Sequence, residues 1–378
     1  MIVDLIYMDA GGGHRSSAQA LQAAIAEQHP HWTARLINIF SILDPQDQFR
    51  KLTGMGPEDF YNKRLARGWT LGMAQELKIL QLSITLLHSK LVARLGSHWA
   101  RARPDLVVSL IPNFNRALYE SLRQALPATP YVTILTDLAD HPPNFWIEPN
   151  QDQYFICGTG RAVDQAIAAG HSPDRIFRSS GMILHPKFYR PSPVDRAAER
   201  EKLGLHPYRA TGIVIFGGQG SNKMRRIAQC LDNTQLILVC GRNRALAAAL
   251  RTLRASAPRL ILEFTSEVPY YMALSDFFIG KPGPGSISEA VAMQLPVIVE
   301  GNSWTMPQET YNTQWVVENR AGVVIPSVRR IPPAVQQIIR ELPRYRAHLA
   351  TLHNRAVFEI PRVLQSILDQ KSGRAEAA

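Results

Sequence analysis

The sequence is poor in cysteine and contains no long uninterrupted apolar segment. Only three cysteines occur among 378 residues, at positions 157, 230 and 240, without the spacing of a metal site, so we expect buried thiols in a reducing compartment. An apolar run of about 18 residues is absent, so no membrane-spanning helix is expected. The first seven residues include Asp4 and lead into a glycine loop, which does not resemble a signal peptide. We therefore expect a cytoplasmic protein.

Acidic residues are scarce relative to basic ones. The chain carries 31 acidic and 42 basic residues, a formal net charge of +11. In residues 49–103, ten basic residues face three acidic ones among aliphatic residues in a pattern compatible with helices. The basic residues are Arg50, Lys51, Lys63, Arg64, Arg67, Lys78, Lys90, Arg94, Arg101 and Arg103. This combination predicts a surface that lies on anionic membrane lipid. No recognised nucleic-acid motif accompanies the charge, so we expect no nucleic-acid partner.

Strand-like and helix-like segments alternate along almost the whole chain. The expected strands are residues 2–7, 34–39, 106–110, 131–135, 153–156 and 175–178, then 212–216, 236–239, 260–264, 277–279, 297–299 and 322–325. This alternation predicts an α/β protein with parallel sheets wound by crossover helices. A chain of 378 residues is long enough for two such domains. We expect a first domain over 1–185, a proline-rich linker over 186–208, a second domain over 209–360, and a terminal helix and tail over 361–378.

A glycine loop follows the first expected strand. Gly11, Gly12 and Gly13 stand directly before His14, and a helical pattern begins at Ala18. This order of strand, loop and helix is typical of a nucleotide or sugar site, although the GxGxxG spacing of a dinucleotide fold is absent. A helix N-terminus disfavours the imidazolium cation, so His14 is a candidate base. A histidine that only caps its own loop is the alternative.

The second half contains a more specific loop, residues 281–290 (KPGPGSISEA), between an apolar strand and a helix. Gly283 and Gly285 let the backbone approach a ligand closely. The free amides of the helix start, where Ser286 lies, favour a phosphate. Glu289, one turn further, offers two oxygen atoms to the two hydroxyls of a ribose. These residues predict a nucleotide-diphosphate site, which in this form usually belongs to a glycosyltransferase.

Further candidates for the nucleotide-sugar site follow neighbouring strands. Ligands collect at the carboxyl ends of strands in open α/β sheets, and two glycine loops follow the strands at 212–216 and 236–239. Amide and carboxylate groups at a later helix start are suited to sugar hydroxyls. These additional candidates are Gly217, Gly218, Gly220, Arg242, Gln308, Glu309 and Asn312. Each of them also has an ordinary structural explanation.

Together these segments resemble a known family. The monogalactosyldiacylglycerol synthases and processive diacylglycerol glucosyltransferases, and more distantly the N-acetylglucosaminyltransferase that makes lipid II, carry similar segments in the same order. The similar segments here are residues 11–18, 133–138 with Trp146, 240–243, 281–290 and 308–312. The resemblance covers nearly the whole chain, and GGGH followed by KxGPGxIxE is specific. It implies a GT-B fold, in which two Rossmann-like domains with parallel sheets face a central cleft.

The resemblance also implies an activity. The family transfers a hexose from a UDP-sugar, with inversion, to a lipid such as diacylglycerol, at the inner face of a membrane and without a metal or other cofactor. In this chain His14 would deprotonate or orient the acceptor hydroxyl, with Asp137 as the second candidate base. Gly12, Gly13 and Trp146 would lie on the acceptor side. The loop 283–286 would hold the diphosphate, and Gln308 and Glu309 the sugar.

Two other classes of function stay open at this point. One is a soluble UDP-sugar glycosyltransferase, or a GT-B epimerase, that acts on a non-lipid substrate. The acceptor side favours keeping it open, because Ile111, Pro112 and Asn113 stand where family members usually have His-Pro. The other is a non-catalytic protein that binds lipid or nucleic acid through its charge. Exposure of residues 49–103 would favour the lipid enzyme, and their burial a soluble one.

Overall fold

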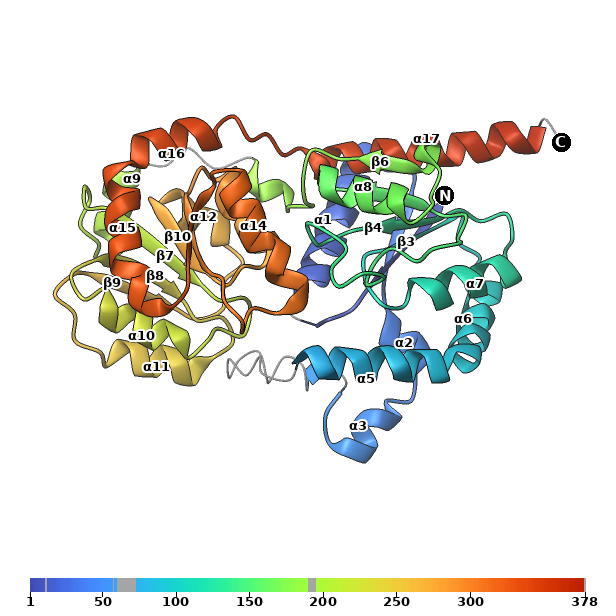
Figure 1. Cartoon of the computed structure of the whole chain (residues 1–378), viewed down its shortest axis with the longest axis horizontal. Helices are drawn as coiled ribbons and strands as arrows, with labels where there is room; N and C mark the ends of the chain where they lie inside the picture. Colours follow the sequence, from blue (N-terminus) through green and yellow to red (C-terminus); the bar gives the residue numbers. More distant parts are fainter. Residues whose placement is uncertain (11, 57, 60–72, 190–194, 377–378) are drawn as a thin grey trace. The chain divides into compact units, whose positions relative to one another are not determined.

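The computed structural model describes residues 1–10, 12–56, 58–59, 73–189 and 195–376 of the chain (Figure 1). These residues form two compact units. The first comprises Met1–Phe60, Gly72–Pro186 and Asn354–Ala378, and the second comprises Lys187–His353, apart from the positions outside the described ranges. Each unit is built around one parallel sheet.

The first unit contains a six-stranded sheet with the order β2-β1-β3-β4-β5-β6, in which all neighbouring strands are parallel. Its strands are β1 (Ile2–Tyr7), β2 (Thr33–Asn38), β3 (Leu106–Ser109), β4 (Tyr131–Ile134), β5 (Tyr154–Cys157) and β6 (Ile176–Arg178). Its helices are α1 (Gly13–Gln28), α2 (Ile39–Leu43), α3 (Gln48–Thr53), α5 (Met73–Leu86), α6 (His88–Ala102), α7 (Asn115–Ala125), α8 (Gly160–Ala168) and α17 (Ala356–Glu376).

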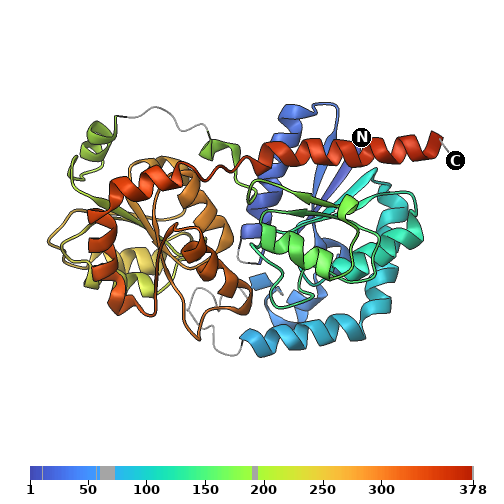
Figure 2. The ribbon, with the colours of Figure 1, turned by 45° about the horizontal axis from the view of Figure 1, so that its top comes forward.

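Burial of the central strands explains why their sequences are continuous apolar runs. Every residue of β3, β4 and β5 is buried, as expected for parallel strands covered on both faces. Leu95 and Trp99 of α6 and Leu118 of α7 join the buried cluster on this sheet. Helix α17 lies alongside α1, as Figure 2 also shows, so the C-terminal helix completes the first unit.

The second unit contains a six-stranded parallel sheet with the order β12-β11-β10-β7-β8-β9. Its strands are β7 (Thr211–Ile215), β8 (Gln235–Val239), β9 (Arg259–Leu262), β10 (Phe277–Gly280), β11 (Val297–Glu300) and β12 (Gly322–Ile325). Its helices are α9 (Arg196–Lys202), α10 (Lys223–Cys230), α11 (Arg244–Arg251), α12 (Val268–Ala273), α13 (Pro284–Ala292), α14 (Thr310–Glu318), α15 (Ile331–Arg340) and α16 (Leu342–Leu349). The strand order reverses between β7 and β10, which makes this pair the topological switch point.

A buried carboxylate ties two outer helices to the amino end of β10. Asp276 accepts hydrogen bonds from Arg196 at 2.9 Å and Arg200 at 2.8 Å, both on α9, and from Arg346 of α16 at 2.7 Å. The backbone amide of Thr211 donates to the same carboxylate at 2.8 Å. Burial acts to raise the pKa of Asp276, but the amide and the guanidinium groups outweigh it and lower that pKa.

All twelve expected strands are present, and their observed ends differ from the expected ones by at most two residues. Three other expectations need correction. Helix α1 begins at Gly13 rather than Ala18, and helix α9 occupies part of the expected linker. The structure also groups residues 354–360 with the first unit, because Asn354 and Arg355 hydrogen-bond to the segment after β6 and α17 packs on α1. Cys157 and Cys240 are buried free thiols as expected, whereas the Cys230 thiol is exposed.

Candidate functional site

The glycine loop of the first unit lies at the carboxyl end of β1. Gly12 is the N-cap of α1 and has a φ of 84°, in the left-handed region that favours glycine. A Cβ atom at Gly12 or Gly13 would meet no other atom within 4 Å, so this backbone is open to a ligand. Gly11 lies outside the described residues. The loop therefore presents His14, the second residue of α1, at the edge of the sheet.

His14 contacts the segment that follows β4. Its Nδ1 lies 2.9 Å from Thr136 Oγ1, and its ring centroid lies 5.8 Å from that of Trp146. In the same segment, Trp146 Nε1 donates a hydrogen bond of 2.9 Å to Asp137 Oδ2. The structure thus brings together both candidate bases and Trp146, three residues separated by up to 132 positions (146 − 14).

Thr136 was missed by the sequence analysis, although it stands beside Asp137. A hydroxyl at hydrogen-bond distance from Nδ1 orients the imidazole ring. Thr136 and Asp137 are both buried, whereas His14 is half-buried. Of the two candidate bases, His14 is therefore the one more accessible to an acceptor hydroxyl.

Trp146 is fully buried, so it supports the other residues of the site from the protein interior. Its backbone amide donates to Asp140 Oδ1 at 2.6 Å, and its carbonyl accepts from Asn115 Nδ2 at 2.9 Å. These bonds hold the indole against His14 and Asp137. A direct contact between Trp146 and an acceptor stays a prediction.

Glu58 is a second residue that the sequence analysis missed. Its carboxylate accepts from the backbone amide of Asp9 in the glycine loop and from Asn38 Nδ2 at 3.1 Å. Burial raises the pKa of Glu58, against the effect of these hydrogen bonds. Asp9 in turn pairs with Arg15 of α1 at 3.0 Å. Through Glu58, the segment that precedes residue 60 is thus hydrogen-bonded to the glycine loop before His14.

The glycine loops of the second unit meet at the carboxyl ends of β7 and β8. Gly217, Gly220 and Gly241 all have positive φ angles, of 74°, 59° and 61°. A Cβ on Gly220 would lie 2.6 Å from the carbonyl oxygen of Cys240, and one on Gly241 would lie 2.3 Å from that of Gly218. Gly220 and Gly241 are therefore required for packing of the two loops, while Gly218 borders open space.

Helix α13 begins directly after β10 at the switch point, where the sequence analysis predicts a phosphate site. Gly283 is its N-cap, Pro284 its first residue, and Gly285 has open space where a Cβ would stand. Ser286 and Glu289 are half-buried on the same helix. Burial raises the pKa of the Glu289 carboxyl to about 7. The helix N-terminus offers free amides to a phosphate, and Glu289 lies one turn further along.

Residues at the start of α14 and just before it contact the loop that precedes α13. Glu309 is buried and its Oε1 lies 2.5 Å from Lys281 Nζ, while Asn312 Nδ2 donates 2.8 Å to the carbonyl of Pro282. Asn312 is fully buried, and its Oδ1 has no hydrogen-bond partner among the described residues. Gln308 is half-buried next to Glu309. Asn312 therefore holds the loop itself, and the contacts of Gln308 and Glu309 with a sugar stay predictions.

An exposed cation and an exposed ring lie together at the end of the sheet. The guanidinium of Arg242, after β8, lies 5.2 Å from the ring centroid of Phe264, after β9. Phe264 is 61% exposed. The sequence analysis named Arg242 but not Phe264, because the pair forms only when neighbouring strands place their following loops side by side.

Helices α3 and α5 expose an apolar surface on the first unit. Its members, here called the apolar helix surface, are large hydrophobic side chains between 43% and 88% exposed: Phe49, Leu52, Ile79, Leu80, Leu82, Leu86 and Leu87. Lys51 of α3, Lys78 of α5 and Lys90 of the first turn of α6 are also exposed. Exposure is the outcome expected of a lipid-binding surface. The candidates Lys63, Arg64 and Arg67 lie outside the described residues.

Within the described part of the chain, no helix is both long enough and apolar enough to cross a bilayer. The same residues contain no group of three or more histidine, cysteine, aspartate or glutamate side chains placed to hold a metal ion.

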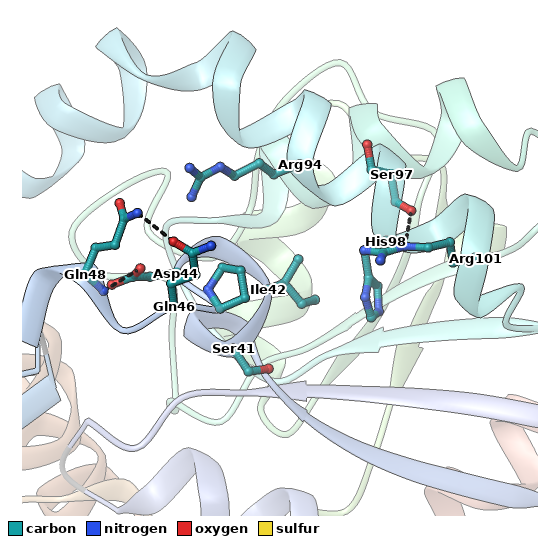
Figure 3. A pocket seen from close by; sticks show the side chains of 10 residues that line it. Ser41, Ile42, Asp44, Gln46, Gln48, Arg94, Ser97, His98 and Arg101 are labelled. Atoms are coloured by element: carbon teal, nitrogen blue, oxygen red, sulfur yellow. Dashed lines mark hydrogen bonds between the residues drawn. The ribbon is translucent and has the colours of Figure 1, made fainter.

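A cavity of about 470 Å³ lies between α2, α3 and α6 (Figure 3). Arg94, His98 and Arg101 line it from α6, and Asp44 lines it from the loop after α2. Asp44 accepts hydrogen bonds from the amides of Gln48 and Phe49, which lower its pKa. Arg94 donates to the carbonyl of Leu43. These contacts fasten α3 to the rest of the unit.

Comparison with protein families gives a match on each half of the chain. The model of the monogalactosyldiacylglycerol (MGDG) synthase family matches residues 14–179. The model of the glycosyltransferase family 28 C-terminal domain matches residues 212–365. The first match contains His14, Thr136, Asp137 and Trp146, and the second contains the glycine loops and α13.

Curated relatives extend along nearly the whole chain. A probable monogalactosyldiacylglycerol synthase 2 of Oryza sativa subsp. japonica is 27% identical over 410 residues, which cover 97% of this chain and 80% of the relative. The monogalactosyldiacylglycerol synthase of Spinacia oleracea is 27% identical over 391 residues, which cover 97% and 72%. Both relatives are chloroplastic proteins by name.

Solved structures agree on the fold. MurG of Acinetobacter baumannii covers 97% of this chain and 99% of its own, with a TM-score of 0.61 and 12% identity. A UDP-GlcNAc 2-epimerase of Neisseria meningitidis gives a TM-score of 0.59 at 14% identity, and covers 98% of this chain and 100% of its own. At such identities these likenesses show the GT-B fold alone. With a family match on each half and these relatives along nearly the whole length, the chain is a glycosyltransferase whose residues 14–179 match the monogalactosyldiacylglycerol synthase family and whose residues 212–365 match the glycosyltransferase family 28 C-terminal domain.

Proposed function

We propose that this protein transfers a hexose from a UDP-sugar to the free hydroxyl of diacylglycerol, with inversion, while bound to the surface of a membrane. The observation that carries the lipid acceptor is the apolar helix surface, which lies on the same unit as His14. An enzyme that acts on a water-soluble acceptor does not need a surface with seven exposed large hydrophobic side chains. The relatives are named as monogalactosyldiacylglycerol synthases, so galactose is the first sugar to test.

The second unit is proposed to bind the donor at the switch point between β7 and β10. The amides at the start of α13 bind the diphosphate, and the Glu289 carboxylate accepts hydrogen bonds from the ribose hydroxyls. Gln308 and Glu309 contact the sugar. Arg242 and Phe264 offer a flat cationic and apolar surface suited to the pyrimidine ring. A structural neighbour from Anabaena, with a TM-score of 0.51, was solved in complex with UDP.

The first unit is proposed to supply the base. The acceptor oxygen attacks the anomeric carbon and forms the new glycosidic bond, while the bond from that carbon to the β-phosphate oxygen breaks and its electron pair leaves with UDP. In the tautomer in which Nδ1–H donates to Thr136 Oγ1, His14 Nε2 takes the acceptor proton. One displacement at the anomeric carbon inverts its configuration. Asp137 remains the second candidate base, although it is buried and accepts from Trp146.

The apolar helix surface is proposed to contact lipid, with its lysines beside anionic headgroups. Burial of one leucine side chain contributes about 1.5–3 kcal/mol, and each lysine near an anionic surface adds about 1 kcal/mol that salt screens. Several such contacts suffice for reversible binding without a spanning helix. This surface would place the protein on the inner face of a membrane as a peripheral protein.

The direct test is a transfer assay with purified protein and vesicles that contain diacylglycerol. Labelled UDP-galactose and UDP-glucose are supplied in turn, and the lipid fraction is examined for a labelled monoglycosyl product with the inverted anomeric configuration. A labelled glycolipid from either donor supports the proposal. Conversion of the UDP-sugar into its epimer without an acceptor, or transfer only to water-soluble acceptors, would replace it with the non-lipid alternative.

A further inference from the structure

Lys281 is the first residue after β10, at the point where the strand order of the second sheet reverses. It stands between two loops that diverge from this point, the glycine loop after β7 and the start of α13. The sequence analysis included Lys281 in the expected nucleotide-diphosphate loop but gave the lysine itself no role. Ligands of open α/β sheets bind in the crevice that such diverging loops form.

The neighbours of Lys281 locate its ammonium group. A Cβ atom added to Gly283 would lie 3.3 Å from Lys281 Cε and 3.5 Å from Nζ, and one added to Gly217 would lie 3.9 Å from Cε. The side chain therefore extends between the two glycine loops, beside the free amides at the start of α13. Both loops lack side chains at the positions that face it.

A buried carboxylate holds the ammonium there. Glu309 Oε1 lies 2.5 Å from Nζ, and the Glu309 side chain is 6% exposed whereas that of Lys281 is 29% exposed. The ion pair is thus open to solvent on the side of the lysine. A carboxylate on the buried side restrains the long, flexible side chain and holds its positive charge between the two glycine loops.

We propose that Lys281 binds the β-phosphate of the donor and of the departing UDP, and that Glu309 is the residue that positions it. The inference rests on the proposed donor site of the second unit and adds to it the group that neutralises the leaving nucleotide. When the bond from the anomeric carbon to the β-phosphate oxygen breaks, the electron pair and its negative charge move to that oxygen. An ammonium beside it stabilises the transition state as charge develops.

The proposed contact between Lys281 and the β-phosphate predicts different effects on the affinities for UDP and UMP. UDP carries a β-phosphate and UMP does not, so Lys281 should matter for UDP and hardly at all for UMP. A lysine that only kept the loops folded would affect both nucleotides alike, since they share the uridine and the α-phosphate. The ratio of UDP to UMP affinity therefore separates the two roles.

The experiment measures both affinities by calorimetry for the wild type, Lys281→Met and Lys281→Arg. Lys281→Met should lose about tenfold to a hundredfold in UDP affinity, the usual value of a charge-assisted hydrogen bond, with less than about a twofold change for UMP. Lys281→Arg should regain part of the ratio. The double variant Lys281→Met with Glu309→Gln removes the unpaired buried carboxylate, and should keep the loss of UDP affinity if the lysine itself is the cause.

Lys202→Met is the matched control. Lys202 belongs to the same unit and also pairs with a glutamate, Glu199, at 2.6 Å, but α9 lies at the opposite end of the sheet, where it binds Asp276. This variant should keep the wild-type ratio. Equal losses for UDP and UMP in Lys281→Met, or an unchanged ratio, would overturn the inference and leave the donor site standing. A wild type that binds neither nucleotide would overturn the donor site as well.

Discussion

We expect the proposed contact between Glu289 and the donor to make donor binding depend on pH. Burial raises the pKa of its carboxyl from 4.5 to about 7, so the free protein holds a neutral Glu289 below neutrality. A ribose donates its hydroxyl hydrogens, and an ionised carboxylate accepts both of them. If Glu289 binds the ribose as proposed, binding of UDP in mildly acidic solution requires this carboxyl to lose a proton first.

The expected size of this effect follows from the linkage between ionisation and binding. UDP affinity should rise by up to about tenfold for each pH unit as the pH increases toward 7, and then level off. Calorimetry between about pH 5.5 and 8.5 measures the profile. The phosphate of UDP also titrates in this range, so Glu289→Gln is needed as the reference. That variant should bind UDP about 1–3 kcal/mol more weakly at high pH, and with a much flatter profile.

Protein stability gives an independent measurement of the same pKa. The raised pKa means that the folded state keeps the proton while the unfolded chain, near pH 4.5, has begun to lose it. The contribution of Glu289 to stability is thus present below 4.5 and is lost as the pH rises to about 7. The difference in unfolding free energy between Glu289→Gln and the wild type should grow by about 3 kcal/mol over this interval.

Glu201→Gln, an exposed site on α9, controls for the loss of one negative charge and should show neither effect. The reasoning on Glu289 is refuted if its Gln variant keeps the pH profile of UDP binding seen in the wild type. A constant stability difference across the same pH interval would show that the carboxyl titrates near its ordinary value.

Three further predictions concern other parts of the molecule. His14→Ala should lower turnover about 10²- to 10⁴-fold with UDP affinity unchanged, and Thr136→Val should lower it less; normal turnover in the first variant would make Asp137 the base. Leu52→Asp should reduce sedimentation with anionic vesicles and leave UDP binding intact, and unchanged sedimentation would remove the apolar helix surface as the lipid contact. Asp276→Asn should lower the unfolding free energy by about 3–5 kcal/mol, measured by urea denaturation, because three guanidinium groups lose their shared carboxylate; a loss below about 1 kcal/mol would contradict this.

The strands were predictable because parallel strands covered on both faces have a simple local signature. Residues 106–109, 131–134 and 154–157 are short continuous apolar runs, and all of them are buried in the sheet. The start of α1 was predicted five residues too late, because its first turn contains Gly13, His14 and Arg15, which show no apolar periodicity. A glycine in the left-handed conformation at Gly12, not a hydrophobic pattern, ends the loop and begins that helix.

The sequence by itself determined the class of fold, the positions of the strands and the loops that follow them, since each depends on a few consecutive residues. It also contained the segments that match a family model on each half. Only the tertiary structure decided which loops meet. Thr136 reaches His14, Glu58 fastens Asp9, and Lys281 pairs with Glu309 because the order of strands in each sheet brings distant segments to one edge. That order depends on long-range packing, which no local pattern of residues records.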